Sequence, residues 1–248
     1  STPFDLEALD YLTGLGMQVL KLPSGEITNR FLLQAAARCA LPMIMSTGMA
    51  DTDEIAAALD LLETTRPGAL TQTYILHCTS SYPTPLDDAN IRAMQGLGER
   101  FNLPAGFSDH TLGMSATLAA VANGARIIEK HVTLDPGMPG PDHAASLPVA
   151  ELPALMRAVR EVSRALGDAT KICRPVEENT RAVARRSIAA ASDIAAGQTF
   201  TETGLTALRP GHGITPMRAE ALIGRRASRD YVAGEIIDPA ELGADGDV

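Results

Sequence analysis

Five short apolar runs alternate with five segments of helical periodicity along residues 17–166. The helical segment 51–65 opens with a capping box formed by Asp51 and Glu54. Runs this apolar suit strands that are buried on both faces, so the alternation predicts a parallel sheet covered by helices. The apolar runs occupy residues 17–26, 42–49, 72–83, 104–110 and 125–132.

The composition changes near residue 168. The stretch 168–181 is polar, and short glycine-punctuated segments follow it. Two of these are similar, DIAAGQTF from Asp193 and DYVAGEII from Asp230. Each copy predicts a strand, an Ala-Gly turn and a second strand. We therefore predict three parts, which are a barrel-type domain over 1–168, a linker over 169–183 and a small β-rich domain over 184–248.

Composition limits the partners and the compartment. The chain has 21 Lys and Arg against 30 Asp and Glu, a formal net charge of −9, and no basic run. Nucleic acid, whose phosphates require clustered cations, is therefore not an expected partner. The three cysteines are odd in number and widely spaced, which fits the reducing cytoplasm. No apolar run reaches the roughly 20 residues of a membrane span, so we expect no membrane partner.

Each apolar run ends in small polar or ionisable side chains. In a parallel α/β barrel the carboxyl ends of all strands lie on one rim, so these side chains would meet there. The alternative for any single Ser, Thr or Asp is a helix N-cap. Caps alone do not require two histidines, a tyrosine and a lysine, so the set favours a functional site. The run ends contain Ser24, Glu26, Ser46, Thr47, Thr79, Ser80, Tyr82, Ser108, Asp109, His110, Glu129 and His131.

His110 and His131 carry the most specific signal. They are one strand-helix repeat apart, so they should stand on adjacent strand ends within reach of one ion. Two neutral imidazoles with open positions suit a divalent ion of the Mn, Zn or Fe type. The alternative is a pair of satisfied core or cap histidines. His143 is a further candidate for a ligand or a substrate contact, whereas we expect His77 to point into the core.

Lys21 lies inside the apolar run VLKLPS. A buried lysine is costly unless it is paired, which makes Lys21 a functional candidate. It would either form a Schiff base with a ketone or stay charged and hold a phosphate or carboxylate. Lys130 is expected to face outward if His131 faces inward, because neighbours in a strand alternate. For Asp142, in a proline-rich loop, turn formation is the alternative to a role in the site.

Several stretches together resemble, in order and spacing, the N-acetylneuraminate (sialic acid) synthase family. They are KLPSGEITN, MIMSTGMA, ILHCTSSYPTPLDDANI, GFSDHTLG, IIEKHVTLD and PGPDHAASL. The C-terminal part, with RPGHG and GEII, is similar to that family's antifreeze-like (SAF) domain. The resemblance covers essentially the whole chain. It implies an α/β fold, a TIM-type (β/α)8 barrel followed by a small β-rich SAF domain of the β-clip type.

The resemblance also implies an activity and its residues. The family is one of metal-dependent transferases that condense phosphoenolpyruvate with N-acetylmannosamine, or a related N-acylated hexose, to a nine-carbon sialic acid and phosphate. His110 and His131 would bind the metal, Mn²⁺ first, with Mg²⁺ or Co²⁺ as alternatives. Glu26 and Lys21 would be catalytic. Phosphoenolpyruvate would contact Lys21, Ser24, Ser46, Ser80 and Ser108, and the sugar hydroxyls would contact Tyr82 and Asp142.

A homodimer is implied as well. The resemblance implies that Arg209, in the RPG motif, reaches the active site of the other subunit and binds the N-acyl group of the sugar. The SAF domain would therefore cross between subunits.

The resemblance begins partway along the family's pattern. We expect a barrel that lacks about its first three strands, because five strand-helix units do not close an eight-stranded barrel. Two free sheet edges would remain, and the chain by itself would have little or no synthase activity. Residues 1–16 would form the helix after the third strand, with Thr2 as its cap and Pro3 at its first position.

Three alternatives to a synthase acting on N-acetylmannosamine stay open. The first is a legionaminate-type synthase acting on a 2,4-diacetamido-6-deoxy sugar, since SSYP and GPDH fit either sugar equally. The second is a Schiff-base sugar-acid aldolase with Lys21 as the amine. The third is a non-catalytic sugar-binding protein built from the same parts.

Overall fold

The computed structural model describes residues 1–243 and divides the chain into two compact units, Ser1–Asp168 and the part from Ala169 onward. Each unit has a hydrophobic core of its own. Within residues 1–243, no helix combines the length and the apolar composition that crossing a membrane requires.

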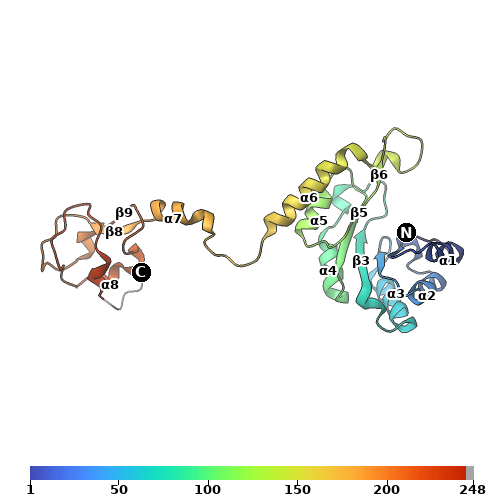
Figure 1. The fold of residues 1–248 in the computed structure, drawn as a ribbon, viewed down its shortest axis with the longest axis horizontal. Helices are drawn as coiled ribbons and strands as arrows, with labels where there is room; N and C mark the ends of the chain where they lie inside the picture. Colours follow the sequence, from blue (N-terminus) through green and yellow to red (C-terminus); the bar gives the residue numbers. More distant parts are fainter. Residues whose placement is uncertain (244–248) are drawn as a thin grey trace. The chain divides into compact units, whose positions relative to one another are not determined.

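A five-stranded parallel sheet forms the centre of the first unit (Figure 1). Its strands follow the order of the chain, and each pairs with the next, for example Leu20 with Met43 and Ile75 with Ala105. All carboxyl ends therefore lie at one edge of the sheet. The strands are β1 (Leu20–Leu22), β2 (Met43–Ser46), β3 (Thr73–Cys78), β4 (Ala105–Asp109) and β5 (Ile128–Lys130).

Helices connect and cover these strands, as the alternation predicts. The capping box is confirmed, because Asp51 Oδ1 accepts the N–H of Glu54 at 2.9 Å and Glu54 Oε2 accepts that of Asp51 at 3.0 Å. The prediction of Thr2 as a cap was wrong, because the carboxylate of Asp5 accepts the N–H of Ala8 at 2.7 Å and starts the first helix there. The helices are α1 (Leu6–Gly14), α2 (Arg30–Arg38), α3 (Thr52–Thr65), α4 (Arg92–Phe101), α5 (Ser115–Ala122) and α6 (Leu152–Leu166).

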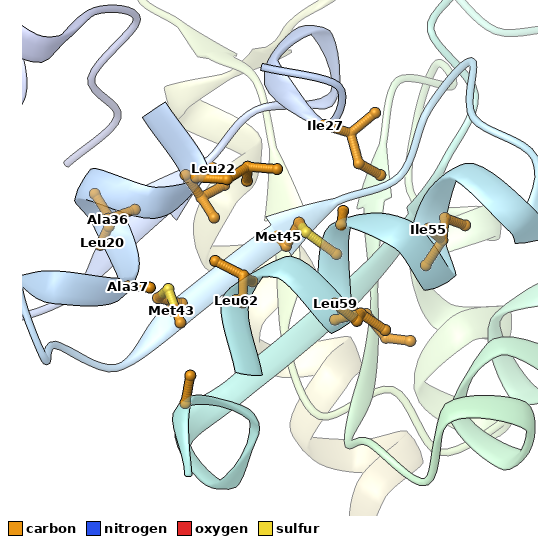
Figure 2. Packing of buried hydrophobic residues seen from close by; sticks show 14 of the residues in the cluster. Leu20, Leu22, Ile27, Ala36, Ala37, Met43, Met45, Ile55, Leu59 and Leu62 are labelled. Atoms are coloured by element: carbon orange, nitrogen blue, oxygen red, sulfur yellow. The ribbon is translucent and has the colours of Figure 1, made fainter. Parts of the chain in front are cut away.

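The core of the first unit lies between the first two strands and helices α2 and α3, as Figure 2 shows. Leu20 and Met43 occupy paired positions of β1 and β2 and are fully buried. Ala37 of α2 and Leu62 of α3 are buried in the same cluster. Full burial of a leucine or methionine side chain contributes about 1.5–3 kcal/mol. This cluster therefore fixes the two strands that bring Lys21 to the carboxyl edge.

The sheet is strongly curved. β1 and β5 are its outermost strands, yet Nζ of Lys21 on β1 lies 3.6 Å from Oε2 of Glu129 on β5. In a flat sheet, four interstrand steps of about 4.8 Å would hold these strands too far apart for that contact. A curved parallel sheet under helices is part of a (β/α) barrel, and with the small β unit it confirms the predicted fold class. Two further short strands, β6 (Val132–Thr133) and β7 (Leu147–Pro148), pair with each other.

The second unit is built around a two-stranded antiparallel sheet. Strand β8 (Ser187–Ala190) pairs with β9 (Leu205–Leu208). Two short helices accompany them, α7 (Glu178–Ala184) and α8 (Ala219–Leu222), and α7 occupies part of the stretch predicted as a linker.

The two similar segments each contain the predicted Ala-Gly turn, Ala196-Gly197 and Ala233-Gly234, with a β-bridge residue on either side of it. They pair with each other, and Ile194 and Tyr231 exchange both backbone hydrogen bonds at 2.8 Å. The aspartate that opens each copy accepts a backbone N–H of the other copy, at 2.8 Å for Asp193 and 2.7 Å for Asp230. The repeat is therefore a reciprocal pairing, in which each copy satisfies polar groups of its counterpart.

A buried polar cluster closes the core of the second unit. The Tyr231 hydroxyl donates to Glu241 Oε1 at 2.7 Å, and the same oxygen accepts the Ser228 hydroxyl at 2.7 Å. Burial, together with the Glu241 hydrogen bond, raises the pKa of Tyr231 to about 12. Burial alone would raise the pKa of Glu241, but hydrogen bonds from Ser228 and Tyr231 outweigh it and hold that pKa below its ordinary value.

Candidate active site

The carboxyl edge of the curved sheet gathers most of the polar residues that the sequence singles out. Because the strands are parallel, side chains from the ends of all five converge there. These side chains are named the strand-end cluster below, and its members are Lys21, Ser24, Ser46, Ser80, Tyr82, Ser108, Glu129, His110 and His131.

His110 and His131 follow the adjacent strands β4 and β5, and their rings stand edge to face. The ring centroids are 5.3 Å apart with an interplanar angle of 86°. Nδ1 of His110 donates to the carbonyl oxygen of Thr79 at 2.8 Å, because a carbonyl only accepts. Burial lowers the pKa of His110 against the opposing effect of that hydrogen bond. The ring is therefore favoured as neutral, with its lone pair on Nε2.

The two imidazoles fit a divalent cation. Metal–nitrogen distances of about 2.1 Å allow two ring centroids to lie up to about 6 Å apart across one ion, and the observed 5.3 Å is within that limit. Ser108 lies 3.5 Å from Nε2 of His110 but gives its proton to Glu129, so that lone pair stays available. Asp142 Oδ2 faces Nδ1 of His131 at 3.7 Å, the side from which a carboxylate commonly orients a ligating histidine.

The protein part of such a metal site consists of two ligands. Throughout residues 1–243, no three His, Cys, Asp or Glu side chains are grouped so that they could hold an ion. The remaining coordination positions would therefore be open to water or substrate, which is the arrangement of a catalytic rather than a structural site.

Glu129, one of the run-end residues expected at this edge but given no specific role, links the two sides of the cluster. Its Oε1 accepts the Ser108 hydroxyl at 2.7 Å, and its Oε2 lies 3.6 Å from Nζ of Lys21. Burial lowers the pKa of Lys21, while Glu129 opposes that shift. The signal that could have assigned Glu129 a role beside the histidines is its position two residues before His131, because alternate residues of a strand share a face.

A group of small polar atoms surrounds Gly48. The N–H of Gly48 donates to Ser24 Oγ at 2.9 Å, and Ser24 Oγ lies 3.2 Å from the Cys78 thiol. A Cβ at Gly48 would come within 2.3 Å of Ser80 Oγ, so only glycine lets these hydroxyls approach. Ser46 Oγ is buried, and in the part of the chain that the structure describes it has no hydrogen-bond partner. These groups suit the oxygens of an anionic ligand.

Tyr82 stands beside both histidines. Its ring centroid is 4.4 Å from that of His110 and 5.6 Å from that of His131. Burial raises the pKa of the phenol, nearby anionic groups add to the rise, and a hydrogen bond with Ser80 opposes it. The half-exposed ring therefore forms one wall of the site and carries a protonated hydroxyl.

Two predicted site residues have other partners. Oε2 of Glu26 accepts the side-chain N–H of Asn29 at 2.6 Å, and Asn29 also caps α2. Arg209 belongs to the second unit, where its Nε donates to the carbonyl oxygen of Ala184 at 2.9 Å and its side chain is exposed. The roles given to both by the resemblance stay predictions.

The other two histidines of the first unit bind neighbouring segments. Nε2 of His77 lies 3.0 Å from the carbonyl oxygen of Ala89, and burial lowers the pKa of His77. Nδ1 of His143 lies 2.7 Å from Thr133 Oγ1. Among the described residues, neither joins the His110 and His131 pair in a three-ligand group.

A buried ion pair lies between the sheet and helix α5. Lys130 Nζ is 2.9 Å from Asp109 Oδ2, and the two side chains are 5% and 0% exposed. Thr117 of α5 donates its hydroxyl to the same carboxylate oxygen. Lys130 thus faces away from the histidines, as strand alternation predicts, and towards the helical layer.

The chain matches known families along most of its length. Residues 1–171 match the sequence model of the NeuB family, and residues 185–243 match that of the SAF domain. N,N'-diacetyllegionaminic acid synthases of Campylobacter jejuni and Legionella pneumophila are 45% and 43% identical over 96% and 94% of this chain. The chain spans 71% and 66% of the length of these two relatives.

More distant matches include a neuraminate enzyme and a solved structure. N-acetylneuraminate-9-phosphate synthase of Mus musculus is 36% identical over 82% of this chain and 55% of its own length. The structure of N-acetylneuraminic acid synthetase from Leptospira borgpetersenii, in complex with citrate, is 37% identical, with a TM-score of 0.66 over 72% of this chain and 61% of that chain. The two legionaminic acid synthases are thus more similar to this chain than the mouse enzyme is.

Proposed function

Since this chain belongs to the NeuB family, we propose that its protein condenses phosphoenolpyruvate with a 2,4-diacetamido-6-deoxy hexose, forming an N,N'-diacetyllegionaminate-type acid and phosphate. The family membership confirms the resemblance found in the sequence and the predicted enzyme class, a synthase of the sialic acid type. The observation that carries the proposal is the strand-end cluster, where one edge of the sheet holds a histidine pair, a lysine paired with a carboxylate, and a hydroxyl that has no hydrogen-bond partner among the described residues.

The sugar differs from the first expectation, which was N-acetylmannosamine. The higher identity to the two diacetyllegionaminic acid synthases than to the mouse enzyme supports the diacetamido sugar, one of the alternatives that the sequence left open.

Phosphoenolpyruvate is proposed to lie between Lys21 and the serines of the cluster. Lys21 is largely buried, where a positive charge attracts phosphate and carboxylate oxygens more strongly than in water. Ser46 supplies a buried hydroxyl that forms no hydrogen bond within residues 1–243. Ser24 and Ser80 supply the hydroxyls around Gly48.

The sugar is proposed to lie on the histidine side, beside Tyr82. His110 and His131 would hold a divalent ion, Mn²⁺ being the first to test, and such an ion supplies polarisation of the sugar aldehyde. The enol carbon of phosphoenolpyruvate bonds to the aldehyde carbon, and the aldehyde oxygen takes up a proton. Water adds at the phosphate-bearing carbon, and as the bond from that carbon to the phosphate oxygen breaks, the added oxygen loses both protons and becomes the ketone oxygen. Glu129, a carboxylate that accepts the Ser108 hydroxyl, is proposed to accept a proton of that water, with Glu26 as the candidate from the resemblance.

Phosphate release tests this function on the intact, full-length protein. With phosphoenolpyruvate and Mn²⁺, we expect the diacetamido sugar to give a higher kcat/KM than N-acetylmannosamine, and a chelator to stop the reaction. A higher kcat/KM with N-acetylmannosamine would overturn the choice of sugar. Sugar binding without phosphate release would point to a non-catalytic binding protein.

The protein is further proposed to act as a homodimer, with Arg209 of one subunit completing the other subunit's site. Arg209→Ala and His110→Ala proteins should each be inactive alone. Dimers that contain one subunit of each kind should regain activity, because one of the two sites then has both residues. An inactive mixture that contains such dimers would contradict the crossing.

An aldolase is the second candidate, because burial lowers the pKa of Lys21 and so favours the free amine that a Schiff base requires. Borohydride treatment with pyruvate would attach the pyruvate skeleton to Lys21, and mass spectrometry would locate it. We expect no adduct, since the proposed synthase keeps Lys21 charged.

A further inference from the structure

We propose that the buried Asp109–Lys130 ion pair positions His110 and His131 for joint metal binding, an inference that rests on the proposed function of the strand-end cluster. Each histidine directly follows one member of the pair in sequence. The pair would therefore set the spacing of the two proposed ligands without touching the ion.

The Lys130 ammonium binds both neighbours of His110. Its Nζ donates to Asp109 Oδ2 at 2.9 Å and to the carbonyl oxygen of Thr111 at 2.8 Å. The backbone that carries His110 is thus fixed on both sides by one charged group. Because Lys130 precedes His131, the same group ties the backbone of the second histidine to the first.

Strand pairing places the four residues on two faces. Asp109 and Lys130 are direct partners across β4 and β5. Since side chains of successive residues point to opposite faces, His110 and His131 emerge together on the opposite side from the ion pair. The pair therefore acts from behind the site, and it leaves the histidine face open to ligands.

The carboxylate of Asp109 is fully engaged. Its Oδ1 accepts the N–H and the hydroxyl of Thr111, both at 2.8 Å, and its Oδ2 accepts Lys130 and the Thr117 hydroxyl. These bonds tie the end of β4 to helix α5 as well as to β5. A carboxylate with this many donors has one available orientation, which is what a positioning role requires.

The position of β5 explains why such a tie matters. In the five-stranded sheet β5 has one strand neighbour, β4, so the start of the segment that carries His131 is aligned from one side only. Replacing a buried ion pair by uncharged groups often leaves stability unchanged. The pair is therefore explained better by the geometry it imposes than by the stability it adds.

The test compares two double variants of the full-length protein. Asp109→Asn with Lys130→Met removes both buried charges, so that no single charge is left unpaired, and Asn keeps an acceptor for Thr111. Asp53→Asn with Arg100→Met is the matched control, because that pair is exposed and 3.8 Å apart. Mn²⁺ affinity is measured by electron paramagnetic resonance titration on protein shown to be folded by circular dichroism.

We expect the buried double variant to bind Mn²⁺ about 10–100-fold more weakly, the usual effect of losing an orienting outer partner. The exposed control should bind as the parent does. Saturating Mn²⁺ should restore much of the activity, since both ligands remain, and a purely structural role would not produce that rescue.

Each other outcome counts against the inference. A folded buried variant with parental affinity overturns it while leaving the proposed function intact. A parent protein that binds no Mn²⁺ overturns the metal assignment and this inference with it. If the double variant does not fold, Thr117→Val decides, because it loosens Asp109 without changing charge, and unchanged Mn²⁺ affinity there also overturns the positioning role.

Discussion

The first unit contains two lysine–carboxylate pairs that differ in burial and in their surroundings. Lys130 and Asp109 lie 2.9 Å apart and are almost completely buried. Lys21 and Glu129 lie 3.6 Å apart, and the Glu129 side chain is 40% exposed. In the first pair, named the closed pair below, Asp109 accepts four hydrogen bonds and Lys130 donates two, all with protein groups. The second pair, named the open pair, belongs to the strand-end cluster, in which the Ser46 hydroxyl has no hydrogen-bond partner among the described residues.

The difference indicates where a ligand is expected. A buried polar group without a partner costs about 1–3 kcal/mol, so a fold keeps one mainly where something else satisfies it. The hydrogen bonds described above for the closed pair all go to protein groups, so this pair fixes the ends of β4 and β5. The cluster around the open pair holds a hydroxyl without a partner among the described residues, and the proposed substrate would bond to it.

The largest loss of activity is expected from substitutions in the strand-end cluster. His110→Ala and His131→Ala each remove one of two proposed ligands and should abolish Mn²⁺ binding and phosphate release. His77→Gln is the matched control, because His77 bonds the backbone of Ala89 outside the strand-end cluster. Titration of Mn²⁺ by electron paramagnetic resonance measures all three, and retained binding in either alanine variant would remove that histidine from the site.

The closed pair should be far more sensitive in stability than the open one. Lys130→Met leaves Asp109 buried and unpaired, which should lower the free energy of unfolding by about 3–5 kcal/mol. Lys21→Met should change it by less than about 1 kcal/mol, because its partner is partly exposed to water. Urea unfolding of both variants checks this, and equal losses would break the contrast.

In substrate binding the order should reverse. Lys21→Met removes the charge proposed to face phosphoenolpyruvate, so its KM should rise about 10–100-fold, the equivalent of one charged hydrogen bond. Lys21→Arg keeps the charge and should recover part of the loss. Steady-state phosphate release measures both, and an unchanged KM in Lys21→Met would place the substrate elsewhere.

The buried polar cluster of Ser228, Tyr231 and Glu241 in the second unit should make stability depend on pH. The pKa of Glu241 is lowered from 4.5, so its stabilising contribution is full above pH 4.5 and is lost as pH falls through the folded-state pKa. The pKa of Tyr231 is raised from 10.0 to about 12, so its contribution is full below pH 10 and is lost as pH rises through that range.

Glu241→Gln should therefore lower the free energy of unfolding of the second unit near neutral pH by about 1–3 kcal/mol, because it weakens the hydrogen bonds from Ser228 and Tyr231. It should also flatten the acid side of the stability curve. Chemical unfolding between pH 3 and pH 8 measures this, and a variant with the parental acid slope would contradict the role given to Glu241.

The smallest effect is expected at Ser46. Ser46→Ala removes a hydroxyl that has no partner in the described part of the chain, so stability should stay equal or rise slightly, while phosphoenolpyruvate affinity falls about 3–10-fold. Thr47→Val is the control, because the Thr47 hydroxyl already donates to the carbonyl oxygen of Leu76 at 2.9 Å. Thr47→Val should lower stability and leave phosphoenolpyruvate affinity unchanged. If instead Thr47→Val lost affinity and Ser46→Ala lost stability, Thr47 and not Ser46 would be the proposed ligand contact.

The sequence predicted the parts of the fold that depend on local pattern. The parallel strands and covering helices follow from apolar runs and caps such as Asp51, and the spacing of His110 and His131 follows from one strand-helix repeat. Both depend on periodicity, which a single sequence displays.

Other features depend on which segments meet, which a local pattern does not contain. The strand, turn and strand pattern of the segments at Asp193 and Asp230 does not reveal that each segment satisfies the backbone of the other. The alternation of side chains along a strand correctly predicted that Lys130 faces outward, but it did not reveal that Asp109 lies on the same outer face. The contact of Lys21 with Glu129 required the curvature of the whole sheet.

The curvature of the sheet also means that the site forms only at the end of folding. The charges of Lys21 and Glu129 meet only after every strand from β1 to β5 has been made and docked, because these two strands are the outermost ones. A chain still emerging from the ribosome with its first strands folded has neither the histidine pair nor the counter-charge. A ligand that contacts both Lys21 and the histidine pair can bind only the complete five-stranded sheet. Its binding would therefore stabilise the native state and not the partly folded intermediates.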